Sequence, residues 1–284
     1  NYGSRPDNQI GIYSILNTDG SRYEFGIPVY NNLQTDAVFS MDYQTNDKLK
    51  NILYSPVNDA SVKNNNGDDQ LFIKNTMPAY STHHLLTSVV SPDYIDVKGD
   101  GLSPDDFGNY VKVNYTKTTD EYKWRMPFDS ASFNPGYYSK EGDDKGSYMY
   151  GEKDLYYVNS IETKTHIAVF YISAREDAMG TAGEHGGGVD NQNKPYRLDS
   201  IALFSKTCEN YGNHALMVPE KTVHFYYSYK LCSEVPNSID TDEGEGKLTL
   251  DSLAFTYKSS DKGLNSKYVF NYGFNPDYSN GKTD

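Results

Sequence analysis

A four-residue pattern (aliphatic, polar, Ser, aliphatic) occurs along the chain and constrains its fold more than any other feature. The copies are Leu86-Thr87-Ser88-Val89, Val158-Asn159-Ser160-Ile161, Leu198-Asp199-Ser200-Ile201 and Leu250-Asp251-Ser252-Leu253. Apolar residues alternate with others after each copy, as in Leu253, Phe255 and Tyr257. Alternation with a period of two residues is typical of a half-buried β-strand. The pattern therefore predicts a series of similar strands.

A second alternating segment follows each copy of the motif. These segments are residues 111–115, 167–171, 223–227 and 269–272. Each unit is thus predicted to be a strand, a connection and a returning strand. The copies begin at residues 86, 158, 198 and 250, so their spacing is irregular and indicates no solenoid. We expect long antiparallel strand pairs, arranged as a meander of hairpins in a curved, coiled sheet or shell segment.

The N-terminal part also predicts a hairpin. Asp19-Gly20 stands between Ile15 on one side and Tyr23 and Phe25 on the other. Asp-Gly between alternating segments is a strong signal for a two-stranded turn.

The domain organisation follows from these strands. We expect residues 1–284 to form a single β-rich segment of a larger chain. The alternative is a subdivision near residue 80, with N-terminal hairpins in 1–80 and the repeated strand pairs in 81–284.

Composition supports an all-β fold. The chain has 27 Tyr residues and 14% aromatic residues, and Tyr suits a half-exposed sheet face because its ring is apolar and its tip polar. Helical periodicity is absent beyond about one short helix. The glycine-rich stretch 183–188 is predicted to be a loop.

The net charge of −13 excludes some partners. An acidic surface repels phosphate backbones, so we predict no nucleic-acid partner. No apolar run approaches the roughly 20 residues that a membrane-spanning helix needs, so we predict no membrane span.

The two cysteines, Cys208 and Cys232, each follow a predicted strand. They are too few for a disulfide framework. Whether they form a bridge stays open at this point.

An acidic loop is the best metal candidate. Calcium requires six to eight oxygen ligands from a flexible loop. The candidate ligands are the carboxylates of Asp96, Asp100, Asp105 and Asp106. Lys98 stands where calcium loops of this kind carry Asp or Asn, and the alternative is an ordinary Asp-Gly turn.

Trp124 is the candidate ligand-binding residue. It is the single Trp of the chain and lies beside Tyr122 and Arg125. It either provides a stacking surface for a sugar or fills the sheet core. No catalytic residues are predicted, because no G-x-S-x-G motif occurs and no His, Ser and carboxylate stand out as a set.

Several segments resemble a known family. The hairpin 19–26 resembles those of Rhs-type (YD-repeat) proteins and of the shell-forming B subunit of Tc toxins. Residues 156–161 followed by 169–171 resemble strand pairs of the same proteins. Residues 247–250 and 268–273 are similar to a variant found in very large exported surface proteins of bacteria with type IX secretion. The resemblance implies a long sheet that coils into a shell around another segment of the polypeptide.

The functional expectation follows from that resemblance. We expect a structural segment of a large secreted or cell-surface β-shell protein that encloses or displays another part of its polypeptide, such as a toxin or a type IX secretion substrate. Its partners would be the rest of its own chain, the secretion machinery or an enclosed toxin segment. The alternative is an extracellular glycan-binding β-sandwich with a calcium loop. The first residue, Asn1, and the loop-like last residues lead us to expect an internal piece of a longer chain.

Overall fold

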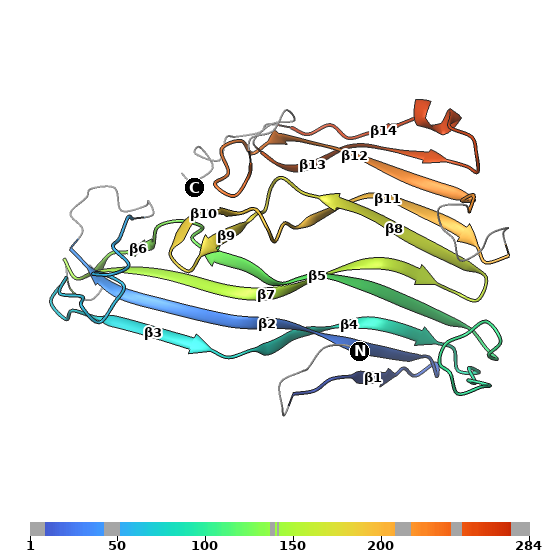
Figure 1. The fold of residues 1–284 in the computed structure, drawn as a ribbon, viewed down its shortest axis with the longest axis horizontal. Coiled ribbons are helices and arrows are strands. Elements are labelled where there is room, and N and C mark those ends of the chain that lie inside the picture. Colours follow the sequence, from blue (N-terminus) through green and yellow to red (C-terminus); the bar gives the residue numbers. More distant parts are fainter. Residues whose placement is uncertain are drawn as a thin grey trace.

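The computed structural model describes residues 9–42, 52–136, 140, 142–207, 217–239 and 246–273, and it is built almost entirely from strands (Figure 1). The strands are β1 (Tyr13–Leu16), β2 (Arg22–Met41), β3 (Phe72–Met77), β4 (Tyr80–Val90), β5 (Tyr110–Met126), β6 (Ser132–Asn134), β7 (Asp144–Glu162), β8 (His166–Ala174), β9 (Gly180–Gly183), β10 (Gly186–Asp190), β11 (Tyr196–Ser205), β12 (Lys221–Leu231), β13 (Lys247–Thr256) and β14 (Tyr268–Val269). A short 3-10 helix, η2 (Lys262–Asn265), precedes β14. The prediction of an all-β fold is confirmed.

Twelve of the strands form one curved antiparallel sheet. Its main order is β1-β2-β4-β5-β7-β8-β11-β12-β13-β14, with β3 added beside β2 and β6 beside β7. Strands β9 and β10 form a separate two-stranded sheet. The order from β4 onward is a meander, as the repeated strand pairs predict. The long strands run side by side across the whole molecule (Figure 1).

The predicted strand pairs are confirmed. β4 pairs with β5, β7 with β8, β11 with β12, and β13 with β14. The Asp19-Gly20 turn also joins β1 to β2, with Leu16 opposite Arg22. Gly20 has a φ of +84°, a left-handed conformation that glycine adopts without strain.

The two faces of the sheet differ in exposure. On β11, Ala202 and Phe204 are buried, whereas Ile201 and Leu203 on the opposite face are half-buried. Ala254 continues the buried face on β13. The alternation seen in the sequence is therefore real, but both faces carry apolar residues.

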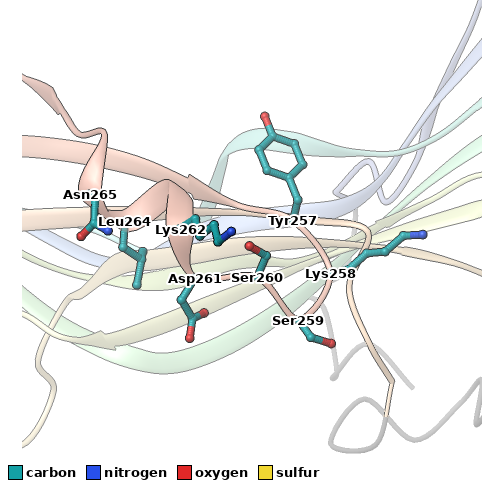
Figure 2. Close-up of a pocket in the computed structure, with 8 residues that line it drawn as sticks. All are labelled: Tyr257, Lys258, Ser259, Ser260, Asp261, Lys262, Leu264 and Asn265. Atoms are coloured by element: carbon teal, nitrogen blue, oxygen red, sulfur yellow. The ribbon is translucent and has the colours of Figure 1, made fainter.

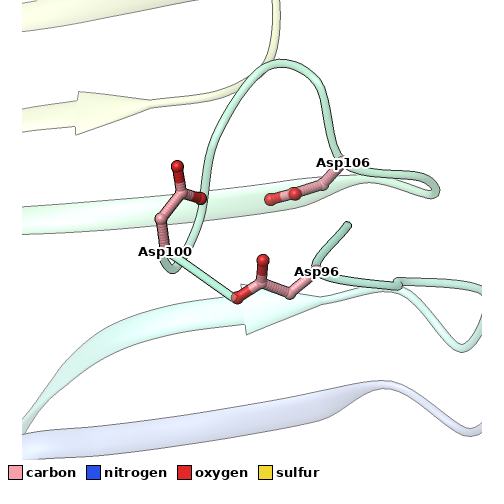
Figure 3. A group of neighbouring side chains, drawn as sticks. All are labelled: Asp96, Asp100 and Asp106. Atoms are coloured by element: carbon pink, nitrogen blue, oxygen red, sulfur yellow. The ribbon is translucent and has the colours of Figure 1, made fainter. Parts of the chain in front are cut away.

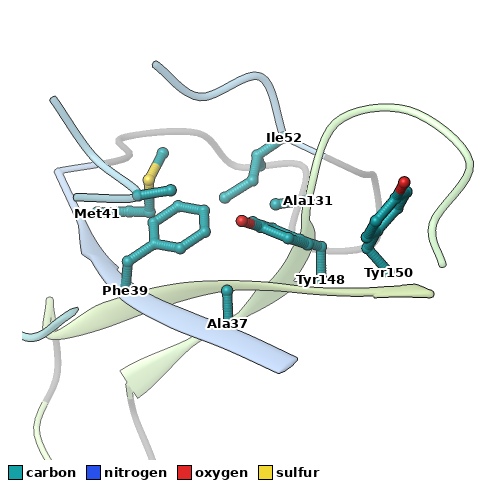
Figure 4. Packing of buried hydrophobic residues seen from close by; sticks show 8 residues of the cluster. Ala37, Phe39, Met41, Ile52, Ala131, Tyr148 and Tyr150 are labelled. Atoms are coloured by element: carbon teal, nitrogen blue, oxygen red, sulfur yellow. The ribbon is translucent and has the colours of Figure 1, made fainter. Parts of the chain in front are cut away.

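The largest core lies at one end of the sheet. Phe39 of β2 and Tyr148 of β7 lie there with ring centroids 6.3 Å apart (Figure 4). Ile52 and Ala131, which pair with each other in an isolated bridge, cover these rings and are fully buried. The core therefore fixes connecting segments onto β2 and β7.

The neighbours of β2 change along its length. Its first half pairs with β4, and its second half lies between β3 and β7. β4 and β5 therefore separate β2 from β7 at one end of the sheet, while β2 and β7 pair directly at the other. No sequence pattern predicted this change of partner.

A buried carboxylate lies where the partners change. Asp154 is 4% exposed and accepts hydrogen bonds from the Tyr30 backbone N–H (3.2 Å) and from Asn32 Nδ2 (3.0 Å). Its Oδ1 also lies 2.9 Å from Lys117 Nζ. These contacts join β2, β5 and β7, and they satisfy a charge that would otherwise be costly to bury.

Candidate functional site

The repeated motif forms a repeated β-bulge. In each copy, the motif Ser pairs with one residue of the strand that precedes it in the sheet. The aliphatic residue two positions before the Ser pairs with the adjacent residue of that same strand. The second residue of the motif therefore has no partner in that strand. These extra residues are Thr87, Asn159, Asp199 and Asp251. A bulge bends its strand and increases the local twist, so each copy of the motif bends its strand at the same motif position.

A tyrosine hydroxyl accompanies three of the four bulges. The donors are Tyr115 on β5, Tyr227 on β12 and Tyr272, three residues after the end of β14. The acceptors are the carbonyls of Leu86, Leu198 and Leu250, at 2.9, 2.8 and 2.7 Å. Each acceptor is the first residue of a motif. The hydroxyl thus links the motif strand to its return strand near the bulge.

The remaining unit lacks this bond for a visible reason. The bonding tyrosine lies three positions after the residue opposite the Ser, as with Tyr227 after His224. On β8 the residue opposite Ser160 is Val169, and the third position after it is Ile172. Isoleucine has no hydroxyl, so the bond cannot form.

One further copy of the motif escaped the sequence analysis. Ile12-Tyr13-Ser14-Ile15 has the same pattern with an aromatic residue at the second position. Ser14 pairs with Glu24, which itself pairs with Ser88 of the first recognised copy. The serines of the two motifs therefore occupy equivalent places on the same sheet face. Allowing Tyr at the second position would have revealed this copy.

The predicted acidic loop connects β4 to β5. Carboxylate oxygens of Asp96, Asp100 and Asp106 lie within 4.8 Å of one another and point toward a common centre (Figure 3). Asp105, the fourth predicted ligand, does not join them, because its carboxylate lies 2.6 Å from Lys98 Nζ. The geometry thus groups three of the four predicted residues.

Hydrogen bonds from the loop itself hold these carboxylates. Asp106 accepts from the Tyr94 hydroxyl (2.7 Å) and from the Ser103 backbone N–H (2.8 Å), and the former bond lowers the pKa of Asp106. Asp96 accepts from the backbone N–H of Gly99 and Gly101. The arrangement is preformed, but several oxygen lone pairs are already engaged.

Lys98 forms an ion pair with Asp105 beside the carboxylate cluster. Its ammonium group lowers the pKa of Asp105 to about 2, and Asp105 in turn raises the pKa of Lys98. The charges of Asp100 and Asp106 raise the pKa of Lys98 further, so its positive charge also acts on the cluster. These carboxylates fit a hard cation such as Ca²⁺, with three protein ligands and room for others.

Trp124 lies within the sheet. Its indole Nε1 donates to Asn31 Oδ1 at 3.2 Å. A Cβ atom on Gly151, directly opposite on β7, would lie 2.6 Å from the indole ring. The indole thus rests on the glycine backbone and is half-buried.

Arg125 holds a second group of polar residues beside the core. Its guanidinium donates to the carbonyls of Glu184 (2.8 Å) and Ser130 (2.6 Å) and to the Tyr54 hydroxyl (3.0 Å). It lies 4.7 Å from the ring centroid of Tyr148. Because these donors point to carbonyls and a neighbouring ring, the group fastens connecting segments to the sheet. No sequence signal had indicated it.

A shallow hollow lies in the turn after β13. Its eight lining residues fall between 257 and 265 and include one carboxylate, Asp261 (Figure 2). Tyr257 and Lys258 point away from Asp261. The hollow therefore brings together no acid–base pair.

Two predictions concern other parts of the chain. Cys232 directly follows β12, while Cys208 lies outside the described residues, so their pairing stays a prediction. Among the described residues no helix is long and apolar enough to cross a membrane.

Comparisons with protein families, with curated proteins and with solved structures gave no match for this chain.

Proposed function

We propose that this chain is a structural sheet segment of a large exported or cell-surface protein, in which the sheet encloses or displays another part of the polypeptide. The observation that carries the proposal is one continuous sheet of twelve strands. A protein that binds or transforms a small ligand usually offers a concave pocket with convergent polar groups. The described residues instead repeat one shape-determining unit.

The repeat supports a shape-forming role. Four bulges occur at the same motif position, and three carry the same tyrosine bond. A repeated bend of one kind coils a sheet progressively. Selection for such a repeat is expected where the curvature of the sheet is itself the function.

Electron cryomicroscopy of the native assembly tests this proposal. We expect β1 and β14 to continue into neighbouring strands of the same curved sheet, with other polypeptide on the concave side. A free-standing domain joined to its surroundings only by linkers would contradict it. Antibody labelling of intact cells provides the matching test of surface location.

The glycan-binding alternative has weaker support. It requires an exposed aromatic cleft between packed sheets, but the indole of Trp124 is hydrogen-bonded to Asn31 and lies against Gly151. Calcium binding is a separate second proposal, favoured by the convergence of Asp96, Asp100 and Asp106. It is compatible with a structural role, because the loop lies at an end of the sheet.

A further inference from the structure

Both edges of the long sheet are open among the described residues. β1 and β14 are the first and last strands of the sheet order, and no described strand pairs with their outer sides. Leu16 is 72% exposed and Val269 is 65% exposed. Residues 12–16 and 268–272 contain no charged side chain. Uncharged edges with free backbone groups are templates for further strand pairing.

The two edges are of complementary kinds. β1 carries the motif Ile12-Tyr13-Ser14-Ile15, and no return strand precedes it among the described residues. β14 is a return strand, and no described motif strand follows it. Inside the sheet, return strands and motif strands meet at the β2–β4, β5–β7, β8–β11 and β12–β13 junctions. The described part of the molecule thus contains four examples of the contact that its two edges lack.

Three of the four interior junctions share one register, whereas at the β2–β4 junction Ser88 pairs with Glu24, the residue opposite Ser14. On the return strand of each of these three junctions, one residue faces the Ser of its own unit, and the residue two positions further along faces the Ser of the next unit. The latter pairs are Asn114 with Ser160, Tyr171 with Ser200, and Tyr226 with Ser252. The residue opposite Ser252 is Val269, the last residue of β14, so Asn271, two residues beyond the end of β14, is the equivalent position. Asn114 donates to the hydroxyl of Ser160 at 3.0 Å. Asn271 has the same side chain, and both are followed by Tyr.

Backbone directions agree with this register. Phe270 N–H donates inward to Asp251 at 2.9 Å, so the N–H of Asn271 points outward. The N–H of Asn17 donates to the Ser21 carbonyl, toward the interior of the sheet, at 2.8 Å. Because successive N–H groups of a strand point to opposite sides, the N–H of Ser14, three residues earlier, points away from the sheet. A pair with both N–H groups facing each other is the hydrogen-bonded pair of an antiparallel ladder.

We infer that β14 of one molecule, together with the residues that directly follow it, pairs with β1 of a second copy of this chain, with Asn271 opposite Ser14. The inference rests on the proposed structural role and adds the partner strand and its register. The contact uses different surfaces on the two copies, so it leaves one open edge of each kind. Such contacts build open chains, or rings where the rotation closes.

Proline substitutions at the two edges test the inference on the full chain. Ser14→Pro and Asn271→Pro each remove an outward N–H and keep the inward bonds. We expect the wild-type chain to form oligomers that grow with concentration in sedimentation velocity. Each variant alone should stay monomeric, and an equimolar mixture should stop at a one-to-one dimer. Ser14→Ala and Asn271→Ala, which keep the N–H, are matched controls that should still associate.

Cysteine cross-linking tests the register independently of the prolines. In a background with Cys208→Ser and Cys232→Ser, a copy with Asn271→Cys should form a disulfide with a copy carrying Ser14→Cys. Pairing with Tyr13→Cys, one residue out of register, should be lost.

Two outcomes overturn the inference. One is dimerisation of Asn271→Pro alone, which would indicate a symmetric β1–β1 contact. The other is a wild-type chain that stays monomeric and gives no cross-link. The proposed function would survive either result if the native assembly shows a continuous sheet, and it would fail separately if these residues form a free-standing domain there.

Discussion

Tyr227 illustrates how one hydroxyl contributes to the repeat. Tyr227→Phe removes the bond to the Leu198 carbonyl and keeps the ring. We expect the free energy of unfolding to fall by about 1 kcal/mol, the net contribution of one hydrogen bond. Tyr171→Phe is the matched control, because that side chain is 42% exposed, and it should change the free energy by less than about 0.5 kcal/mol. Urea unfolding measures both, and equal effects would refute a special role for Tyr227.

Gly151 leaves room for the single Trp. Gly151→Ala would place a Cβ atom 2.6 Å from the Trp124 ring, so the indole must move. Overpacking of this kind costs about 1–3 kcal/mol. Because Trp124 is the only indole, its fluorescence reports both the shift and the loss of stability. Gly183→Ala, where a Cβ atom meets nothing within 4 Å, should leave the emission unchanged.

Calcium should stabilise the acidic loop. Three converging carboxylates repel one another, and a divalent cation relieves that repulsion. With several oxygens already engaged, we expect weak binding, with a Kd on the order of 10⁻⁴–10⁻³ M. Calcium should raise the Tm of the wild-type chain, and chelation should reverse the rise. Asp100→Asn should abolish the response, whereas Asp93→Asn, outside the cluster, should preserve it. An identical calcium response in both variants would place the ion elsewhere.

At the scale of elements, the sequence predicted the strands that follow its motifs. These strands could be predicted because the alternation of apolar and other residues is a local pattern, and any neighbouring strand with the same alternation can pair with it. The bulge at Asn159 or Asp199 was not predicted, since register depends on how two strands meet rather than on either strand alone. The loop predicted over 183–188 proved wrong in part, because β10 begins at Gly186.

The change of strand partners depends on long-range contacts and left no local signal. Lys117 and Asp154 are far apart in sequence, and each alone is typical of a solvated surface residue. Asp106 and Trp124 could be singled out because composition marks them: one lies in an Asp-rich loop, and the other is a unique residue. The Arg125 group could not, since its partners are mostly backbone carbonyls.

The ion pair at the partner change should be strongly coupled. Asp154→Ala removes the acceptor of the Tyr30 N–H, whereas Lys117, whose side chain is 38% exposed, keeps its contact with Asp120. We therefore expect a loss of about 1–3 kcal/mol, the cost of a buried donor left without a partner. Lys117→Met alone leaves the carboxylate to its two other donors. A double-mutant cycle from urea unfolding should show that the two losses are not additive. Additive losses would mean that the pair does not contribute as a unit.

At the scale of the whole molecule, acid should weaken the fold. Hydrogen bonds from Lys74 and Tyr148 lower the pKa of Glu184 against the opposing effect of burial, and the Lys98 ammonium lowers the pKa of Asp105 to about 2. A lowered folded-state pKa means that the carboxylate stabilises the fold above its unfolded pKa and loses that effect as pH falls. We expect the Tm to decline between about pH 4.5 and pH 2. A Tm that stays constant across this interval would contradict these assignments.

The register of the motif serines has a further consequence. From β5 to β13, every added strand pair displaces its Ser by two residues along the preceding strand, which is about 7 Å of strand length. These displacements all have the same sign and therefore add up. The number of units thus determines how far the motif serines shift along the strands from the first of these units to the last. In the inferred assembly, these displacements would contribute to the pitch, and duplication or loss of one of these units would change its dimensions by a fixed increment without any redesign of the remaining strands.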